Sequence, residues 1–409
     1  FKEIKNFDLQ KDNQYEDTDA AAFDIDKDGD LDLYVVSGGN EYKESDKNYM
    51  DRVYLNDGLG NFTRLQISLP RTNGSSVSVS DFNNDGYDDL FLGSRSITGF
   101  YGLSPYSFIM LNNGDNTLSP IEQQRYGMVT DSKWVDINSD GKEDLILAGD
   151  WMPITVLIQE DDLKFTNKTE KYGLSKTNGL WNVVDIKDFN KDGRIDIIAG
   201  NAGTNFKWKP SFKKPVKLYL DDFDDNGTKD IVLAYYNYGI QFPLRGFSCS
   251  SQQVPDLKDK FKKYDIFASL DVQEVYGEEN LENALRLSVN TFESTALINN
   301  KSYYDFKALP NYAQFSSVND IIIEDFDDDE INDILLVGNM YHAEIETTRN
   351  DSGNGLLLKG NGDGNFKEIP ISKSGFFTPG DSKKIISLKR NQDKLFIVAN
   401  NDDRLQIFK

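Results

Sequence analysis

The sequence has little of what disulfide-stapled, zinc-binding or membrane-spanning proteins need. Its 409 residues include one cysteine, Cys249, and one histidine, His342. A single cysteine excludes an internal disulfide, and a single histidine excludes a zinc site built from several imidazoles. No run of residues approaches the roughly 20 apolar residues of a membrane-spanning helix. The chain opens at Phe1 without a signal-like segment, so we expect residue 1 to be a processed end or an internal position of a longer chain.

Positive charge is also scarce. The chain has 45 Lys and Arg against 68 Asp and Glu, which gives a formal net charge of -23. Such a charge repels a nucleic-acid backbone unless basic residues gather on one face. The one dense basic stretch, residues 206–214, is short and lies between two acidic loops. We therefore expect no nucleic-acid partner. Hydrophobic residues make up 38% of the chain, which is enough for a packed core.

A nine-residue acidic pattern recurs six times and organises the chain. It reads Asp-x-[Asp/Asn]-x-[Asp/Asn]-Gly-x-x-Asp, and only the last copy departs from it, with Glu330 in place of glycine. The six copies, here called the acidic loops one to six, occupy residues 24–32, 81–89, 136–144, 188–196, 222–230 and 325–333. Short alternating or apolar runs flank each copy, and these are strand signals.

A hairpin with a turn-rich middle follows most copies, as at residues 53–65, where Asp57 and Gly58 stand at the turn. Each unit then supplies about four antiparallel strands, the size of one propeller blade. We predict an all-β fold: a single domain, residues 1–409, that forms a seven-bladed β-propeller. The fourth blade is expected to be short, because loops four and five are close in sequence. Residues 1–4 are expected to complete the last blade, which lacks the motif.

The longest interval between copies contains a predicted helical insertion. It covers residues 237–290, within the fifth blade, and shows helical spacing after Pro255 and again around Leu281. We expect a small helical elaboration of the propeller and no second domain.

The acidic loops have the composition of calcium sites. Calcium prefers six to eight oxygen ligands, which side chains at positions 1, 3, 5 and 9 and a carbonyl at position 7 can supply. In chain order the predicted ligands are Asp24, Asp26, Asp28, Asp30, Asp32, Asp81, Asn83, Asp85, Tyr87, Asp89, Asp136, Asn138, Asp140, Lys142, Asp144, Asp188, Asn190, Asp192, Arg194, Asp196, Asp222, Asp224, Asn226, Thr228, Asp230, Asp325, Asp327, Asp329, Ile331 and Asp333. We expect five calcium ions, and loop six could hold a sixth although Glu330 disfavours the positive φ of its turn.

EF-hands and plain turns are the two alternatives to a calcium loop of this kind. EF-hands need a bidentate Glu at position 12, where the six copies have Val, Leu or Ala. Asp, Asn and Gly are also common turn residues, but turn chemistry alone does not need an acid at position 9, which every copy has. Calcium is therefore predicted to stabilise a fold that has no disulfide.

At these loops the sequence resembles the FG-GAP/VCBS repeats of integrin α-subunit propellers and of Bacteroidetes-type bacterial surface proteins. The resemblance implies a seven-bladed propeller, export to the outside of the cell or to the bacterial outer-membrane surface, and a binding role. The resemblance does not imply a particular ligand. Together with the acidic loops and with loop aromatics that suit sugar faces as well as protein surfaces, it predicts a calcium-stabilised extracellular module that binds or scaffolds proteins or glycans at the cell surface, alone or within an outer-membrane complex.

If the acidic loops join the first and second strands of each blade, the loops between second and third strands emerge on the opposite face. Aromatic and Arg residues in those loops are candidates for partner binding, since such residues often anchor interfaces: Tyr101, Trp151, Trp208, Arg245, Tyr341, His342 and Arg349. The same residues could instead only pack over the end of the propeller.

Catalysis is the alternative function. His342 with Glu344 could act as an acid/base pair in a carbohydrate-active lyase or hydrolase built on the propeller. The sequence shows neither a nucleophile motif nor a phosphate-binding glycine loop. We therefore expect that the protein is not an enzyme.

Overall fold

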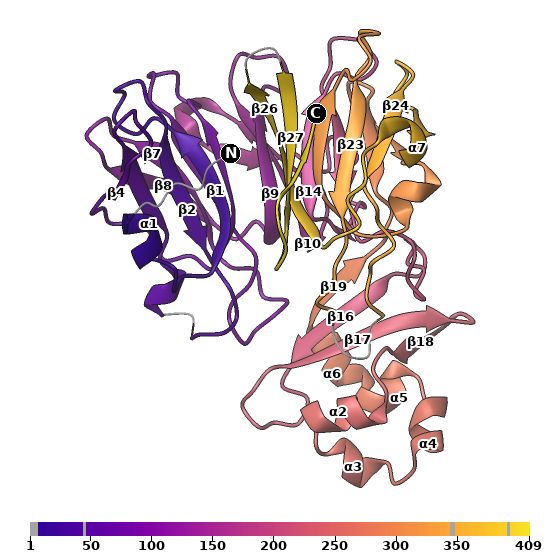
Figure 1. Cartoon of the computed structure of the whole chain (residues 1–409). Coiled ribbons are helices and arrows are strands. Elements are labelled where there is room, and N and C mark those ends of the chain that lie inside the picture. The colour runs from indigo at the N-terminus through magenta and orange to yellow at the C-terminus, as the bar shows by residue number, and fades with distance from the viewer. Residues whose placement is uncertain (1–6, 44–45, 344–347, 391–392) are drawn as a thin grey trace.

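The computed structural model describes residues 7–43, 46–343, 348–390 and 393–409, and in these ranges the chain is mainly antiparallel β-sheet (Figure 1). The chain has the fold of a β-propeller, formed by antiparallel sheets of mostly four strands. The expected strand of residues 1–4 lies outside the described residues.

The first three sheets follow the chain directly. The first contains β1 (Asp17–Phe23), β2 (Asp32–Ser37), β3 (Arg52–Asn56) and β4 (Phe62–Arg64). The second contains β5 (Gly74–Ser80), β6 (Asp89–Ser94), β7 (Ser107–Asn112) and β8 (Leu118–Gln124). The third contains β9 (Met128–Val135), β10 (Asp144–Met152), β11 (Thr155–Gln159), β12 (Phe165–Asn167) and the short β13 (Gly179–Leu180).

Three further sheets continue the series. The fourth contains β14 (Val183–Lys187), β15 (Asp196–Gly200), β20 (Thr295–Asn299) and β21 (Tyr304–Ala308). The fifth contains β22 (Val318–Glu324), β23 (Asp333–Gly338), β24 (Leu356–Gly360) and β25 (Phe366–Ile369). The sixth contains β26 (Ser382–Arg390), β27 (Asp393–Asn400) and β28 (Gln406–Phe408). Two short helices lie beside these sheets, α1 (Phe7–Lys11) and α7 (Ile371–Ser374).

The innermost strands of these six sheets, β1, β5, β9, β14, β22 and β26, lie next to one another in that order. Carboxylates of one inner strand bond to the backbone of the next. Asp19 Oδ2 accepts from Val77 N at 3.0 Å, and Asp131 and Asp320 accept in the same way from β14 and β26. The last sheet reaches the first through Lys384, whose Nζ lies 4.0 Å from Asp19 Oδ1.

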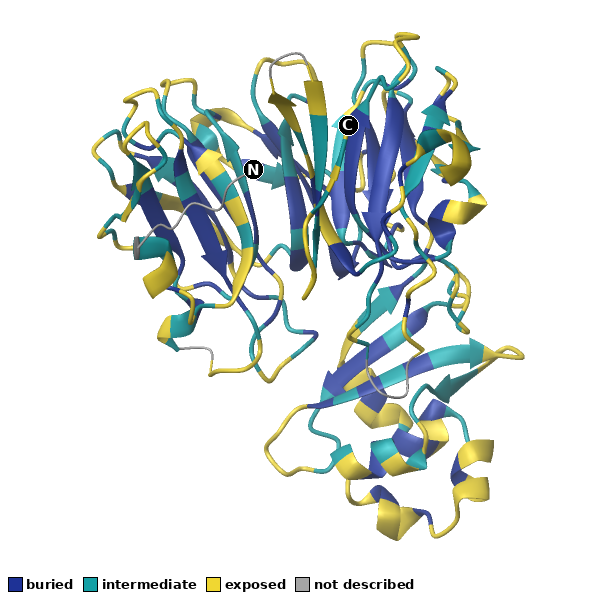
Figure 2. Cartoon of the chain, in the orientation of Figure 1, coloured by how far each residue is buried: buried dark blue, intermediate teal, exposed yellow. Residues whose placement is uncertain are grey.

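The core lies between neighbouring sheets. Because side chains alternate along a strand, each sheet presents apolar residues to both of its neighbours. Phe23 and Val36 of the first sheet pack with Leu90 of the second, and Leu335 of the fifth packs with Ile385 of the sixth. Figure 2 shows that buried residues concentrate in these strands, whereas the connecting loops are largely exposed.

The insertion, residues 201–294, leaves the fourth sheet after β15 and returns at β20. It forms a sheet of its own below the row of propeller sheets in Figure 1. Its strands are β16 (Val216–Asp221), β17 (Asp230–Asn237), β18 (Ile240–Pro243) and β19 (Leu285–Val289). Its helices are α2 (Phe247–Gln253), α3 (Leu257–Lys260), α4 (Tyr264–Ser269), α5 (Val272–Tyr276) and α6 (Glu278–Asn283). The helices pack on one face of this sheet, where Val232 contacts their apolar side chains.

The described residues thus form seven sheets, six in the ring and one in the insertion, so the expected number of seven blades is not confirmed and the distribution of the sheets differs from the expectation. Loop five joins β16 and β17 of the insertion and belongs to no sheet of the ring. The fourth sheet is not short, since β20 and β21 complete it after the insertion. The helices therefore interrupt the fourth sheet and not a fifth blade. A unit of strand, acidic loop and strand has the same sequence pattern in the ring and in the insertion. Only the pairing of its strands shows to which sheet it belongs.

Candidate functional site

Every acidic loop joins the first two strands of its unit, so the loops of the first five ring sheets lie at the same end of their sheets. The connections between second and third strands, and the insertion with them, leave from the opposite end. The chain thus has an acidic-loop face and an opposite face.

The acidic loops share one turn. Position 6 adopts a positive φ, as at Gly86 (+86°), and its N–H donates to the position 1 carboxylate, here Asp81 Oδ2 at 2.8 Å. Glycine takes this conformation at no steric cost. Glu330 nevertheless adopts φ +66° and donates to Asp325 Oδ2 at 2.7 Å. Loop six therefore keeps the common turn, with a residue for which that backbone conformation is strained.

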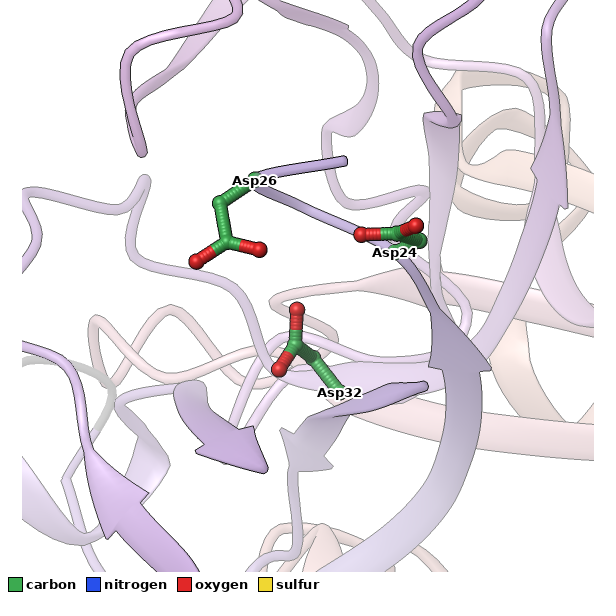
Figure 3. A group of neighbouring side chains, drawn as sticks. All are labelled: Asp24, Asp26 and Asp32. Atoms are coloured by element: carbon green, nitrogen blue, oxygen red, sulfur yellow. The ribbon is translucent and has the colours of Figure 1, made fainter. Parts of the chain in front are cut away.

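Three loops bring carboxylates together in groups that could hold a metal ion. In each, oxygens from positions 1, 3 and 9 lie within 4.8 Å of one another. The groups are Asp24, Asp26 and Asp32; Asp222, Asp224 and Asp230; and Asp325, Asp327 and Asp333. Figure 3 shows the first group, with its three carboxylates turned toward a common space.

Buried oxygens in the first loop have no hydrogen-bond partner in the described part of the chain. They are Asp24 Oδ1, Asp26 Oδ1 and Asp30 Oδ1, and Asp224 Oδ1 is in the same position in loop five. A buried anionic oxygen without a partner is costly unless a cation neutralises it. The residues present therefore fit a metal ion, and their oxygen-only donor set suits a hard cation.

Loops two, three and four have asparagine at position 3 and link their side chains directly. Asn83 Nδ2 donates to Asp85 Oδ2 at 2.8 Å, and the Asn138–Asp140 and Asn190–Asp192 pairs repeat this bond. The backbone N–H at position 7 donates to the position 5 side chain in all six loops. These bonds hold positions 5 and 7 side by side. The position 7 residues are Asp30, Tyr87, Lys142, Arg194, Thr228 and Ile331.

The acid at position 9 has a structural task that the sequence did not indicate. Asp144 is fully buried and accepts from Ile137 N at 3.1 Å and from Gln159 N, on the third strand, at 2.8 Å. Asp32, Asp196 and Asp333 make the same two bonds. Position 9 therefore joins the loop to the sheet, and metal ligation is not its only explanation.

Burial dominates the titration of these position 9 carboxyls. It raises the pKa of Asp89 and of Asp144 to about 7, although backbone N–H groups that bond to the carboxylates act in the opposite direction. A cation among the loop oxygens would favour the charged form.

Loop six carries a second departure from the pattern. The ammonium of Lys359, on β24, contacts Asp327 and lies 2.8 Å from Asp329 Oδ2. Lys359 directly precedes the third-strand residue whose N–H donates to position 9. In the other ring sheets with an acidic loop, this place is taken by Leu55, Leu111, Ile158 and Ile298. Aligning the third strands of the repeats would have revealed this lysine.

The candidate partner residues fall into two groups. Trp151 is buried and Tyr101 and Trp208 are half-buried in a cluster that joins the propeller to the insertion sheet. Trp151 Nε1 donates to Tyr101 Oη at 3.0 Å. These residues attach the insertion to the opposite face of the propeller. Arg245 is half-buried in the insertion beside α2.

The second group is more open. The Arg349 guanidinium lies 3.4 Å from the centre of the Tyr341 ring, and Tyr341 Oη donates to Pro379 O at 2.7 Å. His342 is exposed, and its Nδ1 lies 3.8 Å from Oδ2 of the buried Asp381. Glu344, the expected partner of His342, lies outside the described residues.

Sequence comparison finds a known repeat in the first part of the chain. A family described as FG-GAP-like repeat matches residues 24–92 and 136–199. The chain carries FG-GAP-like repeats. The first FG-GAP match contains loops one and two, and the second contains loops three and four. No curated protein sequence matches the chain.

Several solved structures resemble the chain over most of its length at low identity. A lectin of Agrocybe aegerita that recognises non-reducing terminal N-acetylglucosamine is 13% identical, with a TM-score of 0.32, and the match covers 85% of this chain and 78% of the lectin. BBS1N in complex with ARL6DN is 8% identical, with a TM-score of 0.38 and coverages of 96% and 92%. The exotype rhamnogalacturonan lyase YesX is 13% identical, with a TM-score of 0.36 and coverages of 96% and 72%. In the described ranges, no helix has the length and apolar character needed to cross a membrane.

Proposed function

We propose that the protein is a calcium-stabilised extracellular module that binds or scaffolds proteins or glycans at the cell surface, and that it is not an enzyme. One observation carries the calcium part of this proposal. Carboxylates of the acidic loops converge, and buried oxygens among them have no partner among the described residues.

The choice of calcium follows from the ligands. Calcium accepts many oxygens in irregular geometry, whereas magnesium demands a near-octahedral site and gives up its water reluctantly. Loops that combine carboxylates, amide oxygens and backbone groups suit the first ion better. Bound calcium would also offset part of the net charge of -23 and would link strands in a chain that has one cysteine.

The extracellular location is proposed on the same ground. Calcium modules that bind weakly are filled at the millimolar calcium concentrations outside cells. In a chain without internal disulfides, bound calcium ions can cross-link the strands. A protein at the cell surface, including the bacterial outer membrane, is exposed to calcium from the medium.

The binding role is assigned to the opposite face. There the propeller carries its long second-to-third strand connections and the insertion. At the other end, the side chains of the acidic loops bond to the backbone of their own turns. Loops held by a rigid scaffold are the usual place for recognition.

Thermal unfolding with calcium, with magnesium and with a chelator tests the calcium assignment. Calcium should raise the melting temperature well above that in chelator, and magnesium should raise it less. Asp26→Asn should reduce the calcium effect, whereas Asp57→Asn, at an exposed hairpin turn, should not. A melting temperature that ignores calcium would remove the assignment.

Binding is tested separately with the calcium-loaded chain, against a glycan array and a panel of purified surface proteins. Saturable binding to at least one of them is expected. Binding to none of them would count against a recognition role.

Catalysis is a second candidate because His342 and Asp381 form a close pair on the opposite face. A buried carboxylate that orients an exposed imidazole could support proton transfer. Polysaccharide cleavage by the wild-type chain that is lost in His342→Ala would favour the enzyme, and no cleavage in either would favour the binding module.

A further inference from the structure

A pocket of about 470 Å³ opens at the opposite-face end of the fifth sheet. Residues at the ends of its four strands line the pocket, among them Val318, Gly338, Leu356 and Ile369. A cavity of this size accepts a sugar ring or a short side chain, and it is too small for a broad protein interface.

The lining of this pocket combines aromatic and polar groups. The rings of Tyr312 and Phe315 lie 5.1 Å apart, and Tyr312 is 61% exposed. Glu368 Oε1 accepts from Tyr312 N at 3.1 Å, which fixes the carboxylate in the wall. An aromatic face can stack on the C–H face of a sugar, and a fixed carboxylate can accept a hydroxyl hydrogen.

The basic segment, residues 206–214, begins beside the same pocket. Asn205 Nδ2 donates to Phe315 O at 3.2 Å and to Ser352 Oγ at 3.4 Å, and both of these residues line the pocket. Lys207 follows two residues later, a distance of at most about 7 Å along the chain.

The lysines of the basic segment are exposed and form no ion pair with a described residue: Lys207, Lys209, Lys213 and Lys214. Residues 206–214 contain no acid. Phe212, within the segment, is 60% exposed, and its ring centre lies 4.8 Å from Lys176 Nζ. Lys209 Nζ donates to Thr204 O, and Lys207 Nζ lies 4.9 Å from the centre of the Trp208 ring, so neither ammonium has an acidic partner. In a chain of net charge -23, such a concentration of cations without acidic partners marks a place for an anionic group.

We propose that the pocket and the basic segment together bind an acidic polysaccharide, with a hydroxyl-bearing ring in the pocket and acid groups of neighbouring sugars on the lysines. This inference rests on the proposed binding function and names its ligand class. The pocket and the segment differ in charge, so the ligand must present a neutral group to Glu368 and anions beside it. Acidic polysaccharides carry both neutral hydroxyl groups and acid groups along one chain.

An acidic peptide fits this arrangement less well, because its carboxylates would face Glu368 in the pocket. A nucleic acid carries about one charge per 1.7 Å of duplex, and the acidic remainder of the chain repels so dense a polyanion. Polysaccharides with one or two acid groups per disaccharide carry their charges further apart.

The test measures binding of the full calcium-loaded chain to hyaluronate and chondroitin sulfate, with dextran, poly-L-glutamate and single-stranded DNA as comparison polymers. We expect saturable binding to at least one of the two acidic polysaccharides and weaker binding to all three comparison polymers. The Lys207→Gln/Lys209→Gln variant should bind about tenfold more weakly, as should Tyr312→Ala, a loss of about 1.4 kcal/mol.

A matched control is Lys258→Gln/Lys263→Gln, which removes two exposed lysines of the insertion outside the basic segment and should leave the affinity unchanged. Melting temperatures of the variants show whether they fold. Binding to neither acidic polysaccharide, stronger binding to poly-L-glutamate or DNA, or equal loss in the control would overturn the inference. If neutral glycans or surface proteins still bind the wild-type chain, the proposed function stands while this inference fails.

Discussion

Lys359 Nζ lies 2.8 Å from Asp329 Oδ2 in loop six, so an ammonium group already neutralises carboxylates that a metal ion would need. Bonds to Asp327 and Asp329 raise the pKa of Lys359, which keeps it charged. We predict that Lys359→Gln increases the calcium affinity of loop six. Calorimetric titration should then show one more ion per chain, or a tighter weakest site, than in the wild type.

Lys142→Gln is the matched control for Lys359→Gln. Lys142 stands in loop three, but its ammonium pairs with Asp161 and with no carboxylate of the loop. Calcium binding should therefore be unchanged in Lys142→Gln. If both variants behave alike, the lysine of loop six does not compete with the metal.

Glu330 carries the strain that glycine avoids in the other loops. Its φ of +66° costs a residue with a Cβ about 1 kcal/mol. We predict that Glu330→Gly raises the free energy of unfolding by roughly that amount, less the greater entropy that glycine has in the unfolded chain. Urea unfolding measures the change.

The reciprocal substitution is Gly29→Ala in loop one. Gly29 has φ +94°, and nothing lies within 4 Å of where a Cβ would stand, so backbone strain alone should lower the stability. A stabilising Gly29→Ala, or a destabilising Glu330→Gly, would contradict this account of the turn.

The sequence was enough to predict the propeller, the six acidic loops and the opposite face, because these depend on local patterns that repeat. It could not show which strands pair. Loop five has the same sequence pattern as the other loops but lies in the insertion, and only the pairing of β15 with β20 reveals this. Trp151 was a candidate for partner binding because the sequence placed it in a loop, where a tryptophan looks the same whether a partner or the insertion covers it; in the structure it lies on β10. Lys359 was missed because it comes from a strand distant in sequence.

The two roles of position 9 can be separated in loop three. Asp144 accepts two buried backbone N–H groups, and an Asn there would turn an NH2 group toward one of them. We predict that Asp144→Asn lowers the free energy of unfolding by about 1–3 kcal/mol even with a chelator present. Asp140→Asn, at the exposed position 5, keeps an oxygen for Lys142 N and loses only the exposed bond from Asn138 Nδ2, so it should lower stability mainly in calcium. Equal effects of both variants in chelator would refute the structural role.

Asp51 should make stability depend on pH. It is buried in the first sheet and accepts from Ser37 N at 2.9 Å and from Tyr34 Oη at 2.9 Å. Burial raises the pKa of Asp51 from 3.8 to about 7, so the folded protein holds a proton that the unfolded chain releases. This contribution is greatest below pH 4 and is lost as the pH rises toward 7.

The change that isolates this effect is Asp51→Asn, which cannot ionise. The free energy of unfolding of the wild type should fall between pH 5 and pH 8. In Asp51→Asn this fall should be smaller by about 1–3 kcal/mol. Glu279→Gln, an exposed change, should leave the pH profile as it is. A profile identical in wild type and Asp51→Asn would show that this carboxyl does not titrate in the range.

Trp151 should hold the insertion on the propeller. Its ring packs with Leu218 and Val289 of the insertion sheet and is 7% exposed. Truncation of a buried tryptophan costs about 3–5 kcal/mol, and here the loss falls on the contact between two parts of the chain. We predict that Trp151→Ala makes residues 201–294 more susceptible to limited proteolysis, while the propeller sheets keep their protection from hydrogen exchange. Tyr238→Ala, at a hairpin tip that is 97% exposed, should change neither. If Trp151→Ala instead loosens the whole chain uniformly, the cluster is part of a single cooperative core and the insertion is not a separately anchored unit.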